Sequence, residues 1–435
     1  MSKKRFLYGV ATSSFQIEGD ICNRLPNIWD TFCDQPGKIA DGSNGVIACE
    51  HVERLEQDLD LLSQLGVDAY RFSISWPRVM DVNNQLNEQG LAFYQRLIAG
   101  LKKRNILPFV TLYHWDLPQH LEDKGGWLNR QTAYEFANYA EAVVAHLGDS
   151  VASYATFNEP FCSAYLGYEC GVHAPGLTGR VNGRTAAHHI LLAHGLGVEA
   201  IRKHTQGARV GIVLNFTPCY PHTDNAEDIA ATKNADEYIN QWYAKPVLQG
   251  GYPDVLELLP FEERPPIQQG DLDIIHQPLD FLGVNFYTRL MYSAARDNTE
   301  LFYEHAHGQP QTDIGWEIYP QALTDLLVDL NQRYDLPPIY ITENGAAMKD
   351  HIQDGIVNDW QRTDYYHKHL NALAQAIEHG VNVKGYFAWS LMDNFEWAEG
   401  YLKRFGLIYV DYKTQERTLK NSALAYRDLI ATRTD

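Results

Sequence analysis

Two patterns of apolar and polar residues alternate along this chain. Short runs of apolar, often β-branched residues are typical of buried strands, and stretches whose apolar residues recur every three or four positions are typical of amphipathic helices. Eight strand-like runs occur, at residues 5–11, 68–75, 106–114, 151–159, 208–216, 279–287, 338–344 and 383–390. Helix-like stretches lie between them, for example at residues 90–104, 133–148 and 319–334.

The alternation of strands and helices predicts a parallel sheet. Eight strand–helix units predict a closed (β/α)8 TIM barrel of the α/β class, with its active site at the carboxyl ends of the strands. An open doubly wound sheet is the alternative, but the glycine-rich phosphate turn that usually follows an early strand in that fold is missing. Without a Pro/Gly linker or charge run to divide the chain, we expect residues 1–435 to form a single catalytic barrel domain.

The composition narrows the range of partners. The net charge is −19 at pH 7, so no basic stripe is available to neutralise nucleic-acid phosphates. Hydrophobic residues make up 45% of the chain and aromatic residues 12%. These values are typical of a soluble globular protein with aromatic surfaces to spare for stacking on a small ligand.

The N-terminal residues and the cysteines indicate in which cellular compartment the protein is expected. Residues 1–15 begin like a signal peptide, but their apolar part is too short, and no stretch approaches the ~18 apolar residues of a membrane span. The six cysteines have irregular spacings without a C-x-x-C pair, which is typical of reduced thiols. We expect a cytoplasmic protein without a membrane partner.

Polar or aromatic residues stand where the predicted strands end. In chain order they are Gln16, Arg71, His114 with Trp115, Asn158 with Glu159, Asn215, Asn285 with Tyr287, Glu343 and Trp389. All carboxyl ends of a parallel barrel open on one face. One such residue is explained by a loop cap, whereas eight sets predict a polar pocket.

Two of these residues are glutamates, Glu159 in "TFNEP" and Glu343 in "TENG". They follow the fourth and seventh strands and are expected on opposite lips of the pocket. Cleavage of a glycosidic bond needs such a pair, because one acid protonates the leaving oxygen while a carboxylate faces the anomeric carbon.

The motifs around these glutamates resemble the family 1 glycoside hydrolases, bacterial β-glucosidases in particular. The matching stretches are "GVATSSFQIEG", "AYRFSISWPR", "FVTLYHWDLP", "TFNEP", "FLGVNFYTR", "YITENGAA" and "AWSLMDNFEWAEGY". The resemblance implies a retaining, double-displacement β-D-glucosidase without a cofactor or metal, in which Glu159 is the acid/base and Glu343 the nucleophile. The expected substrates are cello-oligosaccharides and aryl or alkyl β-glucosides, with side activity on β-galactosides or β-fucosides and transglycosylation.

The two glutamates need different protonation states at one pH. We expect Arg71 and Tyr287 to support an ionised Glu343. Glu159 has no obvious cationic partner, so a less polar setting and the nearby Glu343 charge should raise its pKa.

The resemblance also implies a sugar site. The residues expected to bind the glucose are Gln16, His114, Trp115, Asn158, Asn285, Tyr287, Trp389, Glu396 and Trp397. Those expected on the leaving-group side are Trp316, Asn215, His173 and Phe161. Trp389 can alternatively be core, Trp316 an exposed or helix-packing residue, and His173 a loop tether. Phe161 stands where the family often has tryptophan, which puts the leaving-group preference in doubt.

Three alternatives remain. A 6-phospho-β-glucosidase needs cations near the sugar 6-position, where Glu396 and Glu399 are expected instead. A non-catalytic sugar-binding barrel typically lacks one of the two carboxylates. A metal-dependent hydrolase would need ligands, but His188, His189 and His194 do not match the HEXXH pattern, and no G-x-S-x-G marks a serine nucleophile.

Overall fold

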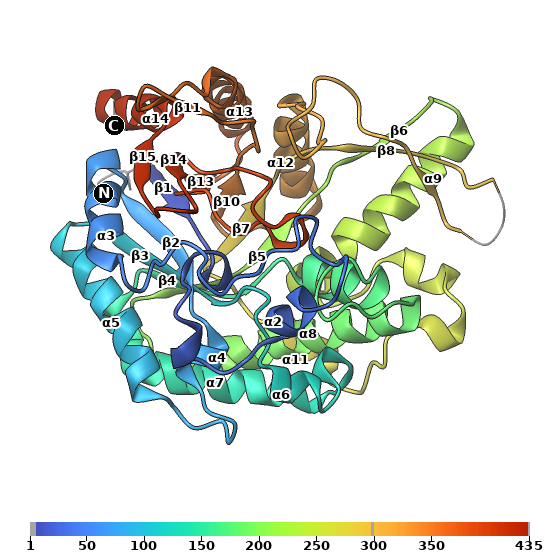
Figure 1. Ribbon diagram of the computed structural model, residues 1–435. Coiled ribbons are helices and arrows are strands. Elements are labelled where there is room, and N and C mark those ends of the chain that lie inside the picture. Colours follow the sequence, from blue (N-terminus) through green and yellow to red (C-terminus); the bar gives the residue numbers. More distant parts are fainter. Residues whose placement is uncertain (1–5, 297–299, 434–435) are drawn as a thin grey trace.

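A closed barrel of eight parallel strands forms the centre of the protein (Figure 1), as seen in a computed structural model that describes residues 6–296 and 300–433. The barrel strands are β1 (Leu7–Ala11), β2 (Ala69–Ser73), β3 (Leu107–Tyr113), β4 (Ser153–Asn158), β5 (Arg209–Asn215), β7 (Phe281–Asn285), β10 (Ile339–Asn344) and β13 (Val383–Trp389). Their order around the barrel follows the sequence, and it closes where β1 pairs with β13. Each strand lies within one of the eight predicted runs, so the predicted fold is confirmed.

Helices surround this barrel (Figure 1). The main ones are α3 (Leu55–Leu65), α5 (Glu88–Lys103), α7 (Gln131–Leu147), α8 (Arg180–Arg202), α10 (Trp242–Gln249), α12 (Gln321–Arg333), α13 (Trp360–Glu378) and α14 (Asn421–Thr432). Shorter helices are α1 (Ser14–Ile17), α2 (Ile28–Cys33), α4 (Trp76–Val79), α6 (Gln119–Glu122), α9 (Ala226–Asp236) and α11 (Asp271–Ile275). The helices predicted at residues 90–104, 133–148 and 319–334 are confirmed as α5, α7 and α12.

The barrel interior is filled by large side chains, so the barrel is a packed core. The Phe109 ring lies 5.1 Å from the Phe387 ring and 5.6 Å from the Tyr340 ring, measured between centroids. Gly9 makes room for this packing, because a Cβ at that position would lie 2.5 Å from the Phe387 ring. The space for a ligand is therefore left at the strand ends.

A small sheet extends the molecule beside the barrel. It contains β6 (Cys219–Pro221), β8 (Leu290–Ser293) and β9 (Tyr303–Glu304), and α9 packs against it (Figure 1, right). Two further hairpins are formed by β11 (Ile352–Gln353) with β12 (Ile356–Val357), and by β14 (Ile408–Val410) with β15 (Arg417–Leu419).

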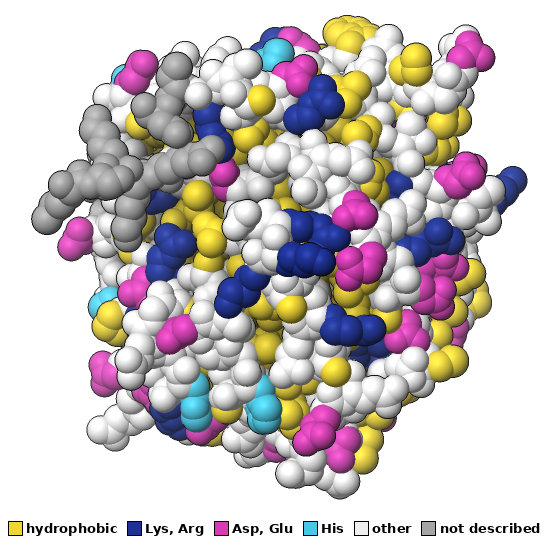
Figure 2. Space-filling view, turned by 90° about the vertical axis from the view of Figure 1, so that its left-hand side faces the viewer, with side chains coloured by type: hydrophobic (Ala, Val, Ile, Leu, Met, Phe, Trp, Pro, Cys, Tyr) yellow, Lys and Arg dark blue, Asp and Glu magenta, His cyan; other side chains and the backbone are white. Residues whose placement is uncertain are grey.

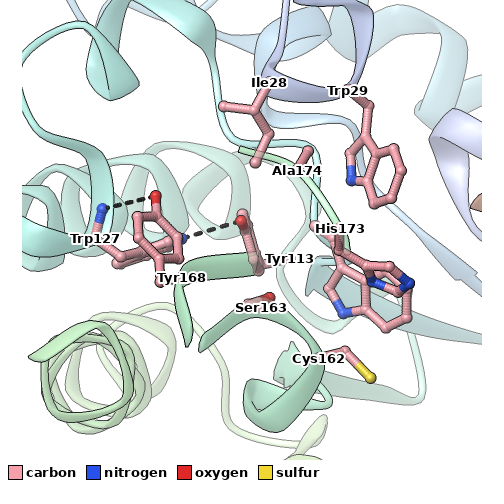
Figure 3. Close-up of a pocket in the computed structure, with 10 residues that line it drawn as sticks. Ile28, Trp29, Tyr113, Trp127, Cys162, Ser163, Tyr168, His173 and Ala174 are labelled. Atoms are coloured by element: carbon pink, nitrogen blue, oxygen red, sulfur yellow. Dashed lines mark hydrogen bonds between the residues drawn. The ribbon is translucent and has the colours of Figure 1, made fainter. Parts of the chain in front are cut away.

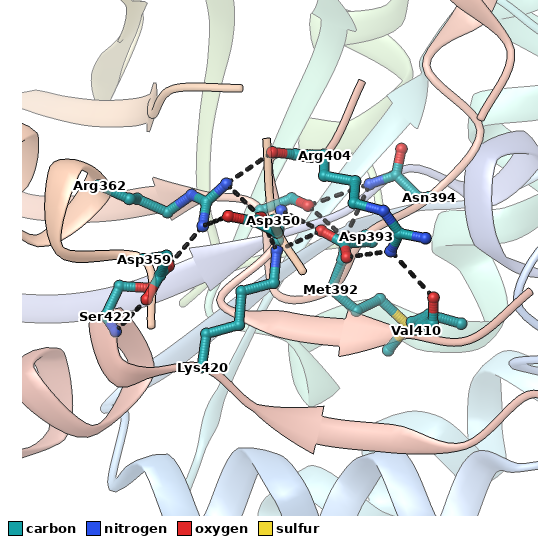
Figure 4. Close-up of polar contacts among 12 residues, drawn as sticks. Asp350, Asp359, Arg362, Met392, Asp393, Asn394, Arg404, Val410, Lys420 and Ser422 are labelled. Atoms are coloured by element: carbon teal, nitrogen blue, oxygen red, sulfur yellow. Dashed lines mark hydrogen bonds and ion pairs between the residues drawn. The ribbon is translucent and has the colours of Figure 1, made fainter. Parts of the chain in front are cut away.

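A buried ion cluster joins the loops after β10 and β13 to the start of α14 (Figure 4). Lys420 Nζ lies 2.6 Å from both Asp350 Oδ2 and Asp393 Oδ1. Arg362 binds Asp350 through Nη2 over 2.7 Å and donates from Nε to the Ala346 carbonyl over 3.1 Å. The cluster therefore fixes both loops to the outer helices.

The surface over α3 and α5 carries interspersed acidic and basic side chains (Figure 2). Arg104 joins the two helical segments through Asp60 at 2.6 Å and Glu56 at 3.1 Å. Such exposed pairs contribute little to stability, and this face of the barrel keeps a solvated, mixed-charge character. Within the described residues, no helix is both long and apolar enough to cross a bilayer.

Candidate active site

A cavity of about 510 Å³ lies at the carboxyl ends of the barrel strands. It is lined by most of the residues expected from the sequence, namely His114, Trp115, Glu159, Phe161, His173, Asn215, Asn285, Tyr287, Trp316, Glu343, Trp389, Glu396 and Trp397. Residues from many separate loops thus meet at one face, as the barrel topology predicts.

Both candidate catalytic glutamates follow a local irregularity in strand pairing. The register between β10 and β7 shifts between Ile341 and Glu343, and the register between β4 and β5 shifts between Ala155 and Asn158. Such irregularities re-aim side chains at barrel rims. Glu159 itself has a left-handed backbone with φ of 46°, which is uncommon and strained for a non-glycine residue.

Glu343 is held at both carboxylate oxygens. Arg71 Nη1 donates to Oε1 over 2.6 Å and Tyr287 Oη donates to Oε2 over 2.7 Å. Burial raises the pKa of Glu343, and the Arg71 charge is the largest of the effects that oppose this rise. The expected contacts with Arg71 and Tyr287 are present, although the sequence did not indicate how strongly burial works against them.

Glu159 sits between an amide and a thiol. Asn285 Nδ2 donates to Oε1 over 2.6 Å, and Cys162 Sγ donates to Oε2 over 3.0 Å. Burial, followed by the charge of Glu343, raises the pKa of Glu159 to about 7. This agrees with the expected direction and leaves a substantial protonated fraction near neutral pH.

Three of the expected site residues, two for the sugar and one for support of the nucleophile, lie behind the cavity wall. Gln16, Arg71 and Asn158 are almost completely buried and are not among the side chains that line the described cavity. Arg71 Nη2 donates to Asn158 Oδ1 over 2.7 Å, and the Asn158 amide nitrogen lies 3.1 Å from His114 Nε2. These residues therefore support the ones that line the cavity.

Gln16 in particular is occupied by protein partners. Its Nε2 donates to Asn394 Oδ1 over 2.9 Å and to the Phe395 carbonyl over 2.8 Å, while its Oε1 accepts from Ser13. These bonds fix the segment that leads to Glu396.

Aromatic rings form one wall of the cavity. His114 stacks between Trp389 and Trp397, with centroid distances of 5.9 and 5.8 Å and interplanar angles of 18° and 16°. Burial lowers the pKa of His114 well below its usual value, so the ring is neutral. Trp389 lines the cavity although it is 3% exposed, and its face is suited to stacking on the apolar side of a sugar.

Glu396 is a third acid that lines the cavity, beside Glu159 and Glu343. Burial and the nearby carboxylates, Glu343 foremost, raise its pKa to about 8. The protonated form of Glu396 is therefore favoured at neutral pH, and in that form it can donate as well as accept a hydrogen bond. Ionisation of all three acids in one small volume is unfavourable because their negative charges repel one another. The sequence alone did not reveal that the three acids lie this close together.

The four residues expected on the leaving-group side, Trp316, His173, Asn215 and Phe161, all line the cavity. The Trp316 ring lies 5.3 Å from the Tyr287 ring, and His173 lies between Trp29 and Trp115 at 5.2 and 5.5 Å. Next to His173 is a small aromatic pocket lined by Ile28, Tyr113, Trp127 and Tyr168 among others (Figure 3).

Other lining residues were not expected. They are Cys162, Tyr165, Leu166, Val172, Phe216, Thr217, Ile239, Thr288, Leu290, Tyr292, Glu304, His307, Ile314, Ala398 and Phe405. Several come from the small side sheet or from the π-helix Cys162–Glu169 that follows β4. Their sequence pattern is that of ordinary core or loop residues, so no signal in the sequence distinguished them. Glu399, which was expected near the sugar 6-position, also lines the cavity.

The histidines of α8 each have a partner outside a metal site. His188 Nε2 lies 2.8 Å from Asp271 Oδ2, His189 Nδ1 lies 2.9 Å from the Trp127 carbonyl, and His194 Nδ1 lies 2.7 Å from Thr156 Oγ1. In the described ranges, no group of three or more His, Cys, Asp or Glu side chains is arranged to hold a metal ion.

The sequence matches the family Glycosyl hydrolase family 1 over residues 2–434. The chain belongs to this family. It is 48% identical to a β-glucosidase of Agrobacterium sp. over 98% of this chain and 94% of that protein. It is 44% identical to the bifunctional β-D-glucosidase/β-D-fucosidase of Bifidobacterium breve, with 98% of each chain covered.

A solved structure is also similar over almost the whole chain. The virulence factor SghA of Agrobacterium tumefaciens superposes with a TM-score of 0.96 and 46% identity, over 98% of this chain and 97% of that chain. SghA has also been solved with its substrate analogue salicin. The protein is therefore a glycoside hydrolase built on a TIM barrel.

Proposed function

We propose that this enzyme is a retaining β-D-glucosidase that releases glucose from the non-reducing end of β-glucosides. The observation that carries the proposal is the contrast between the two glutamates. Glu343 is clamped by a guanidinium and a phenol, whereas Glu159 has only an amide and a thiol and a pKa of about 7. A nucleophile paired with a proton donor is the arrangement that double displacement requires.

In the first step Glu159 gives its proton to the glycosidic oxygen. The bond between that oxygen and the anomeric carbon breaks, its electron pair leaves with the aglycone, and a Glu343 carboxylate oxygen bonds to the anomeric carbon from the opposite face. Arg71 and Tyr287 fix the attacking carboxylate.

In the second step Glu159, now ionised, removes a proton from water. The water oxygen bonds to the anomeric carbon, and the ester to Glu343 breaks. Two inversions give net retention. The loss of the negative charge of Glu343 in the ester favours the ionised form of Glu159 at this stage, because the like-charge repulsion between them is gone.

The substrate class is supported by the relatives and by the cavity. The similar enzymes are named for β-glucosidase activity, and the cavity has both an aromatic wall and further lining residues, Phe161, Asn215 and Trp316, that a leaving group can contact. We propose cello-oligosaccharides and aryl or alkyl β-glucosides as substrates. Transfer of the glucosyl group to a sugar hydroxyl in place of water follows from the same intermediate.

A phosphorylated sugar fits this site poorly. None of the cavity-lining side chains in the described part of the chain is a lysine or an arginine, while Glu304, Glu396 and Glu399 line it. A dianionic phosphate would therefore find no cation to offset its desolvation. A role limited to sugar binding is disfavoured because both carboxylates are present and oriented.

The test is the Glu343→Ala variant with an aryl β-glucoside. Turnover should be abolished, and azide or formate should restore part of it, because a small anion can occupy the vacated space and attack the sugar. Nuclear magnetic resonance should identify the product with azide as the α-glucosyl azide. A β-configured adduct, or activity that survives without an added anion, would contradict the proposed nucleophile.

A further inference from the structure

The thiol of Cys162 contacts the oxygen of Glu159 that has no other donor among the residues that the structure describes. Cys162 begins the π-helix after β4, and its backbone N–H donates to the Glu159 carbonyl over 2.9 Å. This turn brings the sulfur to 3.0 Å from Glu159 Oε2. Figure 3 shows the sulfur directed away from Tyr113, Trp127 and Tyr168, and Cys162 also lines the main cavity.

The neighbouring amide determines which oxygen carries the proton. Thr342 Oγ1 donates to Asn285 Oδ1 over 2.6 Å, which leaves Asn285 Nδ2 as the donor toward Glu159 Oε1 over 2.6 Å. Oε1 therefore accepts a hydrogen bond whether or not Glu159 is protonated. The proton of the acid form is consequently carried by Oε2.

A thiol suits both forms of that oxygen. Its S–H is a weak donor to an ionised Oε2, and its sulfur is a weak acceptor when Oε2 bears the proton. Burial, with the Glu159 charge next, raises the pKa of Cys162 well above its usual value, so the thiol keeps its hydrogen. A strong donor would instead stabilise the carboxylate and weaken the acid.

We infer that Cys162 is a positioning residue for the acid/base: its thiol holds Glu159 by Oε2, the oxygen that transfers the proton, and thereby tunes the pH at which activity falls on the alkaline side. The inference rests on the proposed role of Glu159. It adds a residue to the hydrogen-bonding shell of the proton donor and gives a function to a cysteine that the sequence left unexplained.

Other charged groups also face Glu159. The charge of Glu343 raises the pKa of Glu159, and the charge of Arg71 lowers it. The charge of Glu159 in turn raises the pKa of Glu396. The Tyr287 phenol is neutral because burial raises its pKa well above the usual value, and His173 is neutral because burial lowers its pKa to about 4. These groups stay in place when only Cys162 is changed, so variants of Cys162 isolate the contribution of the thiol.

The experiment compares Cys162→Val and Cys162→Ser with the parent enzyme. Both variants keep a side chain of similar size, but valine cannot donate and serine donates more strongly. The alkaline limb of kcat/KM for a glucoside with a poor leaving group should move up by about half a unit to one unit in Cys162→Val, and down by a similar amount in Cys162→Ser. The matched control is Cys170→Ser, at the other end of the same π-helix, where the thiol is exposed and no shift is expected.

Each result decides between the possibilities. If the limb lies at the same pH in the parent and in both variants, the inference is overturned. If Cys162→Val does not fold, the test depends on Cys162→Ser alone. An alkaline limb that does not move down in Cys162→Ser then overturns the inference. The Glu159→Gln variant separates the two proposals. An alkaline limb that persists in Glu159→Gln refutes the proposed function itself. An alkaline limb that disappears in Glu159→Gln but does not move in the Cys162 variants refutes only the inference about the thiol.

Discussion

Arg71 Nη1 lies 2.6 Å from Glu343 Oε1, although 272 residues separate the two in sequence. Their strands, β2 and β10, are separated by β1 and β13 in the barrel. The guanidinium therefore reaches across the upper barrel interior and also binds Asn158 through Nη2 over 2.7 Å. One planar cation thus fixes residues from the strands that carry each of the two candidate catalytic glutamates.

Replacing this cation should change the acidic side of the pH profile. In Arg71→Met the charge that lowers the pKa of Glu343 is lost, so that pKa rises further. Because a nucleophile must be ionised, the acid limb of kcat/KM should move to higher pH by about one to three units. Steady-state rates on an aryl glucoside from pH 4 to 8 provide the measurement. The surface variant Arg104→Met is the control, and an unmoved acid limb in Arg71→Met would show that Arg71 does not influence the nucleophile.

Glu159→Gln should discriminate between leaving groups. A nitrophenolate leaves almost without protonation, so its release in the first step should be largely retained. An alkyl alcohol needs the proton, and its release should slow by about 10²–10⁴-fold. The second step lacks its base in both cases, so stopped-flow measurements with the nitrophenyl substrate should give a burst followed by slow turnover. Equal losses of the first step for both substrates would count against Glu159 as the acid.

Glu396 should distinguish sugars by their 6-hydroxyl. If Glu396 binds the 4- and 6-hydroxyls, Glu396→Ser removes both contacts from a glucoside but only one from a 6-deoxy-β-glucoside, which lacks the 6-hydroxyl and is otherwise identical. The ratio of kcat/KM for glucoside to 6-deoxyglucoside should therefore fall by about tenfold, equivalent to one hydrogen bond of ~1.4 kcal/mol. Matched nitrophenyl substrates make the comparison, since their leaving group is the same. A ratio that does not move would place Glu396 away from the sugar's outer edge.

Lys420 should matter for stability more than for chemistry. Its ammonium is fully buried between Asp350 and Asp393. Removing one member of a buried ion cluster leaves uncompensated charge and costs about 3–5 kcal/mol, so Lys420→Met should unfold at a clearly lower temperature in calorimetry. Lys368→Met is the matched control, because Lys368 pairs with Asp364 at 2.6 Å on the surface. Equal melting temperatures for the two variants would rule out the structural role.

The sequence predicted the barrel because eight strand-like apolar runs alternate with helix-like stretches, and it predicted the pocket because these runs end in polar or aromatic residues. It also predicted the two glutamates and the contacts of Glu343 with Arg71 and Tyr287. It did not predict that Gln16 is occupied by Asn394 and Phe395, since those bonds depend on how two distant loops meet.

The sequence also did not predict the raised pKa of Glu396. Its pKa depends on burial and on charges brought by separate loops, and neither is encoded in local residue patterns. The sequence analysis missed the lining residues Tyr165, Leu166 and Ile239 for another reason. An apolar residue that lines a pocket cannot be distinguished by sequence pattern from one that packs in the core.

The closure of the barrel between β1 and β13 has a consequence for the making of the enzyme. The first strand to leave the ribosome lacks one of its two neighbours until residues 383–389 have been synthesised. Lys420, which fixes the loops after β10 and β13, emerges later still. A nascent chain therefore exposes unpaired strand edges for most of its synthesis, and catalysis begins only once translation is nearly finished.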